Sequence, residues 1–291
     1  GKIYPLFALA LIFMAIGILV VLYTKGGVLP ELWDGLHNTH PNAEALPIFP
    51  IMFVSIACGA ISGFHATQSP LMARCMTNEH HGRPVFYGAM ITEGIVALIW
   101  AAAATIFFHD NGMAESNASV VVNDITRSWL GTIGGVLAIL GVVAAPISTG
   151  DTALRSARLI VADFLHLEQK KMRSRLLICI PIFLITIGVL LYSLRDAAGF
   201  DMIWRYFAWV NQTLSVFTLF AVSVFLAKER SGHYYLVTLI PALFMLAVCS
   251  SYIVVAPEGF AKPQSYILPV ALGISLVALV LFMLWRQKMI H

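Results

Sequence analysis

The sequence has few charged residues and no clustered cysteines. Of its 291 residues only 11% are charged, whereas soluble domains carry about 25%. Its 18 Lys and Arg exceed its 15 Asp and Glu by only 3 charges, a bias too weak to indicate a nucleic-acid partner. The 4 Cys residues form no C-x-x-C or Cys/His zinc pattern. These features exclude an ordinary water-soluble globule and say nothing about the redox compartment.

The sequence also lacks the motifs of common enzymes and channels. It has no H-E-x-x-H, no G-x-S-x-G, no phosphate-binding loop and no G-x-G-x-x-G. The pairs His37/His40 and His80/His81 stand without the further ligands that a metal site needs. No repeated filter motif indicates a channel. We therefore expect a protein that is not an enzyme and that uses no cofactor other than a coupling ion, Na⁺ or H⁺.

Long apolar stretches dominate the sequence instead. Hydrophobic residues make up 59% of the chain, and the mean hydropathy is +0.84. A membrane-spanning helix needs about 20 mostly apolar residues. Eight stretches meet this requirement: 3–23, 47–77, 85–108, 129–150, 176–194, 206–227, 234–256 and 269–285. The sequence therefore predicts an all-α integral membrane protein with about eight transmembrane helices.

The basic residues predict the orientation of these helices. Lys and Arg accumulate in cytoplasmic loops. One side of the membrane holds 13 of the 18 basic residues if it carries both ends of the chain and the loops after the second, fourth and sixth stretches. The other side holds the rest: Lys25, Arg127, Arg195, Arg205 and Lys262. We expect both ends to be cytoplasmic. The basic run 168–175 is either a topology signal or a contact with anionic lipid head groups.

The second stretch is interrupted by a polar segment, Ser62-Gly-Phe-His-Ala-Thr-Gln-Ser-Pro70. Gly63 can end the preceding helical segment because glycine adopts dihedrals that other residues avoid. Ser69 and Pro70 resemble a helix start, with serine as N-cap and proline at the first helical position. We therefore expect one discontinuous helix, made of two half-helices that meet within the bilayer. The alternative is a simple proline kink whose freed backbone groups bond to neighbouring helices.

A helix break inside the bilayer predicts a binding site. Non-helical backbone in hydrocarbon must line a cavity or be buried in protein. Discontinuous helices form the substrate and ion sites of many secondary transporters. Asn211 and Gln212 in the sixth stretch are either interhelical contacts or part of the same cavity. The residues that we assign to substrate binding are Ser62, Gly63, Phe64, His65, Thr67, Gln68, Ser69 and Asn211.

Two ionisable residues at membrane depth are candidates for proton coupling. His65 lies at the break and either relays a proton or joins two helices as a neutral hydrogen-bond donor. Glu93 lies about two turns into the third stretch and is either a functional carboxylate or a protonated structural one.

A third group of polar residues ends the fourth stretch. Asp151 lies four residues before Arg155, so the two can form an ion pair on one helix face. The other interpretation is that Ser148, Thr149 and Asp151 supply oxygen ligands to a small cation such as Na⁺. The chain also begins without an initiator Met and enters an apolar stretch at once, so we expect a C-terminal fragment whose earlier helices are missing.

Four stretches of the chain resemble the carbon starvation protein A (CstA) family of bacterial inner-membrane transporters. They are 49–66, 88–93, 150–158 and 204–212. The resemblance extends through nearly all 291 residues, and the string CGAISGFH at 58–65 is specific. The continuation Thr-Gln-Ser-Pro after Ala66 is similar to that of the shorter branch of the family.

The resemblance implies the inverted-repeat, LeuT-like architecture of the amino acid–polyamine–organocation superfamily. Residues 1–291 would then form a single transmembrane transporter domain. The last helix of the first repeat would lie at about 3–23, the second repeat at about 47–227, and two appended helices at about 234–285. In LeuT-like carriers the counterpart of the fourth stretch helps to bind sodium, which supports Ser148 and Thr149 as ligands.

The resemblance also implies a function in the bacterial inner membrane. It implies import of peptides, or of a small carboxylate such as pyruvate, during carbon starvation and driven by a proton or sodium gradient. The expected partners are thus a small-molecule substrate and membrane lipid, with no nucleic acid. The alternative is a membrane sensor or scaffold that binds a small nutrient without net transport.

Overall fold

The computed structural model describes residues 4–26, 29, 33, 37–38, 46–56, 62–111, 118–143, 145–195, 197–230 and 232–290. Within these ranges the chain is helical and has no strand. Six helical segments are long and apolar enough to cross a membrane: Pro5–Lys25, Glu79–His109, Met172–Arg195, Met202–Glu229, Leu236–Val255 and Gln264–Met289. The all-α membrane fold expected from the sequence is therefore confirmed. The protein is a multi-pass membrane protein.

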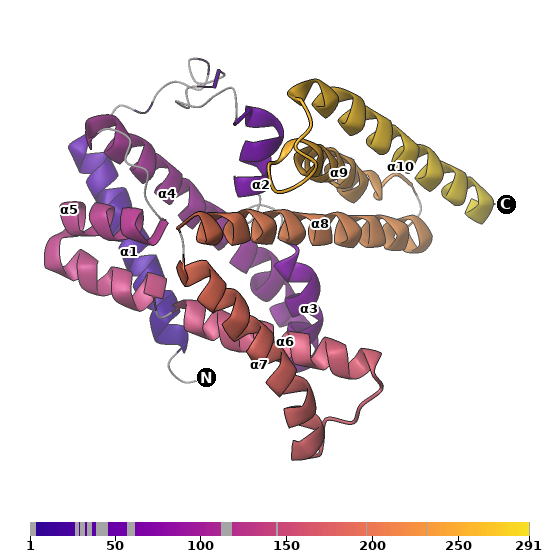
Figure 1. The fold of residues 1–291 in the computed structure, drawn as a ribbon, viewed down its shortest axis with the longest axis horizontal. Coiled ribbons are helices and arrows are strands. Elements are labelled where there is room, and N and C mark those ends of the chain that lie inside the picture. Colours follow the sequence, from indigo (N-terminus) through magenta and orange to yellow (C-terminus); the bar gives the residue numbers. More distant parts are fainter. Residues whose placement is uncertain are drawn as a thin grey trace. The chain divides into compact units, whose positions relative to one another are not determined.

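The chain divides into two compact units (Figure 1). The first unit comprises residues 1–36 and 81–184, and the second comprises residues 37–80 and 185–291. The boundary between residues 184 and 185 falls within α7 (Met172–Arg195), so this helix contributes one part to each unit.

The first unit is built around α1 (Tyr4–Lys25). This helix packs against α4 (Ala89–Asn111), α5 (Ala118–Ala138), the π-helical turn η5 (Ile139–Val143) and α6 (Ala145–Phe164). Its core contains the buried side chains Met14, Ile18, Ala103, Ile125 and Ala138. Two short turns, η3 (Glu79–His81) and η4 (Arg83–Gly88), precede α4.

The second unit is built around α8 (Ala197–Glu229) and α9 (Leu236–Val255), which pack along each other. The C-terminal α10 (Ile267–Ile290), drawn in yellow in Figure 1, covers α9 after the short η6 (Gln264–Tyr266). Three short elements complete the unit: the π-helical turn η1 (Ile48–Met52), α2 (Phe53–Ile56) and α3 (Phe64–Cys75). Its core joins α2, α8 and α9 through Val54, Val216, Met245, Val248, Cys249, Tyr252 and Ala256.

Two of the eight stretches expected to span the membrane do not form one continuous helix. The second stretch is divided into η1, α2 and α3, as the predicted break requires. The fourth stretch, 129–150, was expected to be continuous, but the backbone at Gly131 (φ 62°, ψ −145°) is not helical. That conformation is essentially restricted to glycine, and the apolar pattern around it carries no sign of the turn.

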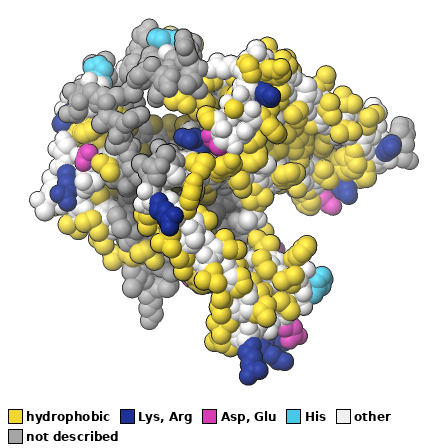
Figure 2. All heavy atoms as spheres, in the orientation of Figure 1, with side chains coloured by type: hydrophobic (Ala, Val, Ile, Leu, Met, Phe, Trp, Pro, Cys, Tyr) yellow, Lys and Arg dark blue, Asp and Glu magenta, His cyan; other side chains and the backbone are white. Residues whose placement is uncertain are grey.

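The described surface is largely apolar. Figure 2 shows hydrophobic side chains over most of the visible described surface, with Lys and Arg confined to a few places. One such place is the start of α7, where Lys170, Lys171, Arg173 and Arg175 are exposed. Apolar surface of this extent is typical of helices that lie in hydrocarbon.

Candidate functional site: the helix break in the second unit

The helix break lies between α2, which ends at Ile56, and α3, which begins at Phe64. Residues 57–61 lie outside the described ranges. Gly63 precedes α3, and its carbonyl oxygen accepts a hydrogen bond from the N–H of Ala66 at 3.0 Å. The expected restart at Ser69 and Pro70 is therefore wrong, because both residues lie inside α3. A proline inside a helix removes one backbone hydrogen bond and crowds the carbonyl four residues earlier, yet α3 continues through Pro70 to Cys75.

The start of α3 is bound directly to α8. The hydroxyl of Ser62 lies 3.3 Å from Oδ1 and 3.2 Å from Nδ2 of Asn211, within hydrogen-bond distance of both. Both side chains are buried, each with 8% exposure. A β-carbon added to Gly63 would lie only 2.2 Å from the backbone carbonyl oxygen of Asn211. The sequence left open whether Asn211 is an interhelical contact or part of the same cavity, and the structure shows it in contact with Ser62 at the break. Glycine is required at position 63 for lack of space.

Asn211 also lines two cavities in this unit. The first, called here the Thr67 cavity, measures about 400 Å³ and is lined by Thr67, Ile203, Tyr206, Phe207, Val210, Asn211 and Leu214. The second, the Arg205 cavity, measures about 130 Å³ and lies among α2, α8 and α9. Its lining residues are Ile51, Val54, Ser55, Trp204, Arg205, Phe207, Ala208, Asn211 and Tyr252. Mostly apolar walls with a few convergent polar groups are typical of small-molecule sites.

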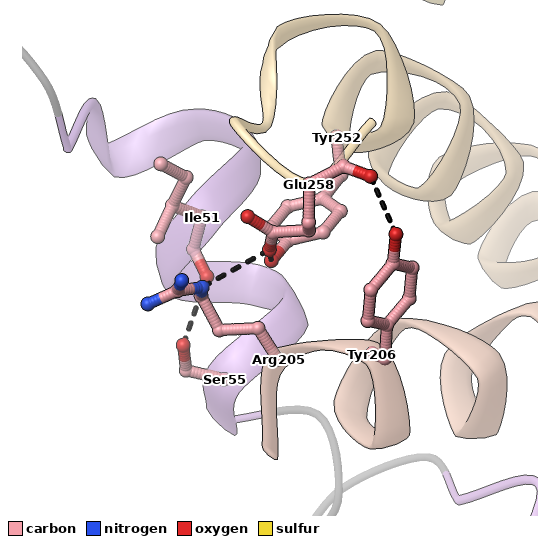
Figure 3. Close-up of polar contacts among 6 residues, drawn as sticks. All are labelled: Ile51, Ser55, Arg205, Tyr206, Tyr252 and Glu258. Carbon is pink, nitrogen blue, oxygen red and sulfur yellow. Dashed lines mark hydrogen bonds and ion pairs between the residues drawn. The ribbon is translucent and has the colours of Figure 1, made fainter. Parts of the chain in front are cut away.

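A buried carboxylate lies beside the Arg205 cavity (Figure 3). Arg205 donates from Nε to Oε1 of Glu258 at 3.1 Å, and the hydroxyl of Tyr252 donates to the same oxygen. The hydroxyl of Tyr206 donates to the backbone carbonyl of Glu258 at 2.6 Å. The Glu258 side chain is only 2% exposed, whereas that of Arg205 is 47% exposed. The loop after α9 is therefore fastened to α8 by a charged pair.

The sequence does not predict this charged pair. In the sequence Arg205 is one basic residue at the end of an apolar stretch, and Glu258 belongs to none of the candidate sites. The two residues are 53 positions apart and belong to no motif. The one available signal was an acidic residue, Glu258, in the short loop between two apolar stretches.

The other predicted binding residues lie in α3 and α8. Gln68 and Ser69 are partly buried in α3. Phe64 and His65 form the first turn of α3, but their side chains lie outside the described part of the structure. Gln212, next to Asn211, is fully buried.

The predicted ion-coupling residues other than His65 belong to the first unit. Glu93 is exposed on α4. On α6, Thr149 and Asp151 are exposed, while the side chain of Ser148 lies outside the described part. Asp151 accepts an ion-pair contact from Arg155 at 2.8 Å, as the spacing of four residues predicts. Within the described ranges, no three His, Cys, Asp or Glu side chains form a group able to hold a metal ion.

Comparisons with known proteins agree with the membrane fold. The sequence model of the family described as "Carbon starvation protein CstA" matches residues 6–129 and 111–251. A protein named "Peptide transporter CstA" from Campylobacter jejuni is 26% identical over 80% of this chain and 43% of its own length. "Pyruvate/proton symporter BtsT" from Escherichia coli is 37% identical over 32% of this chain and 14% of its own length.

An "Uncharacterized membrane protein" from Haemophilus influenzae is 41% identical over 40% of this chain and 36% of its own length. The chain thus spans less than half the length of these three curated relatives. No solved structure gives a significant match.

Proposed function

Because the chain belongs to the carbon starvation protein CstA family, we propose that it forms part of a secondary active transporter. The proposed substrate is a peptide or a small carboxylate such as pyruvate, imported during carbon starvation. The observation that carries the proposal is the polar helix break at Ser62 and Gly63, bound to Asn211 inside an otherwise apolar membrane protein. Breaks of this kind supply backbone dipoles and polar side chains to substrates at membrane depth.

The proposed architecture is LeuT-like. In it, α1 ends the first repeat, the segment 47–227 forms the second repeat, and α9 and α10 are appended. The names "Peptide transporter CstA" and "Pyruvate/proton symporter BtsT" of two relatives support the choice of substrates. We place the protein in a bacterial inner membrane, surrounded by lipid, with both ends of this chain in the cytoplasm. A transport role of this kind requires no catalytic activity.

The coupling ion in this proposal is H⁺ or Na⁺. His65 and Glu93 are the proposed proton-coupling residues. Ser148 and Thr149 are the proposed ligands of Na⁺, with Asp151 as a third candidate whose carboxylate already pairs with Arg155. Replacing Thr149 by Val removes one hydroxyl ligand, so a sodium-coupled carrier would need about tenfold more Na⁺ for half-maximal uptake, equivalent to about 1.4 kcal/mol.

The proposal is tested with the complete protein in proteoliposomes. Uptake of labelled pyruvate and of a labelled dipeptide is followed under a proton gradient, with and without Na⁺. We expect concentrative uptake of one of the two. Asn211→Ala removes the side-chain contact with Ser62 and should reduce uptake at least tenfold. Thr218→Val is the matched control, since Thr218 lies on the same helix and its hydroxyl donates to the Leu214 carbonyl of its own helix at 2.9 Å.

Two results would contradict the proposal. Binding of pyruvate or dipeptide without net flux would indicate the sensor or scaffold instead. Full uptake by Asn211→Ala would show that the helix break is not the substrate site.

A further inference from the structure

A cavity of about 170 Å³ lies between α6 and the part of α7 that belongs to the first unit. Its lining residues are Asp151, Leu154, Arg155 and Arg158 from α6, and Cys179 and Phe183 from α7. Positions 151, 155 and 158 are spaced by four and three residues, and positions 179 and 183 by four. Side chains at these spacings share one helix face, so each helix presents a single face to the cavity.

Arg158 lines this cavity with a buried donor that has no acceptor. Its side chain is half-buried, and its Nε has no hydrogen-bond partner within the described part of the chain. A guanidinium nitrogen removed from water without an acceptor is unfavourable. Arg155 donates from Nη2 to Asp151 at 2.8 Å. The lining thus holds two cations and one anion, so one positive charge remains to be balanced.

The loop that joins α6 to α7 adds further positive charge. Residues 151–184 include six basic and three acidic residues. Four of the basic residues are exposed at the start of α7, where Figure 2 shows dark-blue side chains at the bottom of the view: Lys170, Lys171, Arg173 and Arg175. Arg175 lies four residues before Cys179, on the face of α7 that lines the cavity. The charge around the cavity therefore favours an anion.

Exposed apolar side chains flank the cavity. Between residues 172 and 184 of α7 only Ile178 is buried. The apolar side chains at positions 176, 177, 180 and 184 are 48–64% exposed, and on α6 Ile160 and Phe164 are 54% and 82% exposed. A soluble anion gains nothing from such surroundings, whereas an amphiphile places its charge at the arginines and its hydrocarbon along the helices.

We propose that this cavity binds the phosphodiester head group of an anionic phospholipid, with Arg158 and Arg155 as its ligands. Guanidinium groups bind phosphate oxygens through charge-assisted, paired hydrogen bonds. A volume of about 170 Å³ equals the space of roughly six waters at about 30 Å³ each, which accommodates a phosphate group.

The position of the cavity along the helices agrees with a head group. Arg158 lies six residues before the end of α6, and Cys179 lies seven residues after the start of α7. At about 1.5 Å per residue, both are about 10 Å from the helix ends, close to the boundary between head groups and hydrocarbon. In the proposed orientation this end faces the cytoplasmic leaflet, where anionic lipids attract basic segments. The inference is independent of the proposed substrate.

The test follows the reaction of Cys179 with N-ethylmaleimide in the purified complete protein. Cys179 is half-buried in the cavity lining, so a bound head group should shield it. Phosphatidylglycerol in mixed micelles should slow the reaction about fivefold. Phosphatidylcholine, which has no net charge, and inorganic phosphate should leave the rate unchanged. Cys75, exposed at the end of α3, is the internal control and should react equally under all conditions.

Three variants identify the ligands of the head group. Arg158→Gln should require about tenfold more phosphatidylglycerol for half-maximal protection of Cys179. Arg173→Gln is the matched control, because it removes an equal charge two residues from Arg175 and so from another face of α7. It should need less than about twice the wild-type amount. Arg155→Gln should need about threefold more lipid. Its ion pair is exposed, so this variant provides an answer even if Arg158→Gln does not fold.

Four results would overturn the inference. Equal protection by phosphatidylcholine would show contact with acyl chains and no recognition of the head group. Protection by inorganic phosphate alone would indicate a site for a soluble anion. Equal effects of Arg158→Gln and Arg173→Gln would indicate diffuse attraction to the basic loop. A Cys179 that does not react even without lipid would show that other parts of the complete protein fill the cavity. Each readout is binding, so these failures leave the proposed transport function unaffected.

Discussion

A β-carbon at position 63 would come within 2.2 Å of the Asn211 carbonyl oxygen and 2.7 Å of the Leu214 β-carbon. Gly63 has ordinary helical dihedrals (φ −63°, ψ −18°), so its role is to allow close approach and not to adopt an unusual backbone. The first turn of α3 is therefore held against α8 at a distance that only glycine permits.

This contact predicts a marked loss of stability on Gly63→Ala. The added methyl group must displace backbone, not a flexible side-chain end, so we expect a cost of about 1–3 kcal/mol and reduced uptake. Gly273→Ala in α10 is the matched control, because a β-carbon there meets nothing within 4 Å. Thermal unfolding of the two purified variants measures the difference. Equal melting temperatures would show that α3 and α8 are not held this closely.

Gly131→Ala should destabilise the first unit for a different reason. At φ 62° and ψ −145° the backbone adopts a conformation that is nearly restricted to glycine, although a β-carbon would have open space around it. We expect a loss of about 1–3 kcal/mol. Gly150→Ala in α6, also with open space but without a positive φ, should have a small effect. Similar unfolding temperatures for both variants would contradict the bent geometry of α5.

The ion pair of Asp151 and Arg155 should contribute little to stability. The two side chains are 45% and 59% exposed, and such pairs are worth about 0–1 kcal/mol. We expect Asp151→Asn and Arg155→Gln to unfold within about 1 kcal/mol of the wild type, and to leave sodium dependence unchanged. A tenfold rise in the Na⁺ needed by Asp151→Asn alone would instead identify Asp151 as a cation ligand.

The packing of α10 on α9 depends on Tyr235 and Arg286. The guanidinium carbon of Arg286 lies 4.4 Å from the centre of the Tyr235 ring, and Nη1 donates to the tyrosine hydroxyl at 3.0 Å. Tyr235→Phe keeps the ring and should cost about 0.5–1.5 kcal/mol. Arg286→Met removes both contacts and should cost about 1–3 kcal/mol.

Lys288→Met serves as the control for this pair, since Lys288 is exposed two residues further along α10. Its unfolding temperature should match that of the wild type. If Tyr235→Phe destabilises as much as Arg286→Met, the contact of the cation with the ring contributes nothing.

The membrane class and most helix bounds follow from local sequence. The span expected at 234–256 is observed as α9, Leu236–Val255, and the span expected at 3–23 as α1, Tyr4–Lys25. Hydropathy is a sum over neighbouring residues, so long apolar runs identify such helices without any knowledge of their partners. The ion pair of Asp151 and Arg155 was predictable for the same reason, since helical spacing alone brings the two together.

The helix break was predictable in kind but not in position. Polar residues between 62 and 70 indicated an interruption, yet α3 begins at Phe64 because Gly63 fits closely against Asn211 of a distant helix. The turn at Gly131 was not predicted from the sequence, because a glycine in an apolar run can equally serve the close packing of two helices.

The sequence by itself determined that this chain is an all-helical membrane protein with a polar interruption in its second apolar stretch. The tertiary structure alone decided that the interruption contacts Asn211, and that Arg205 pairs with a buried Glu258 beside a cavity. The physical reason is that burial and ion pairing depend on distances between side chains far apart in the chain. The periodicity of a single helix carries no information about such distances.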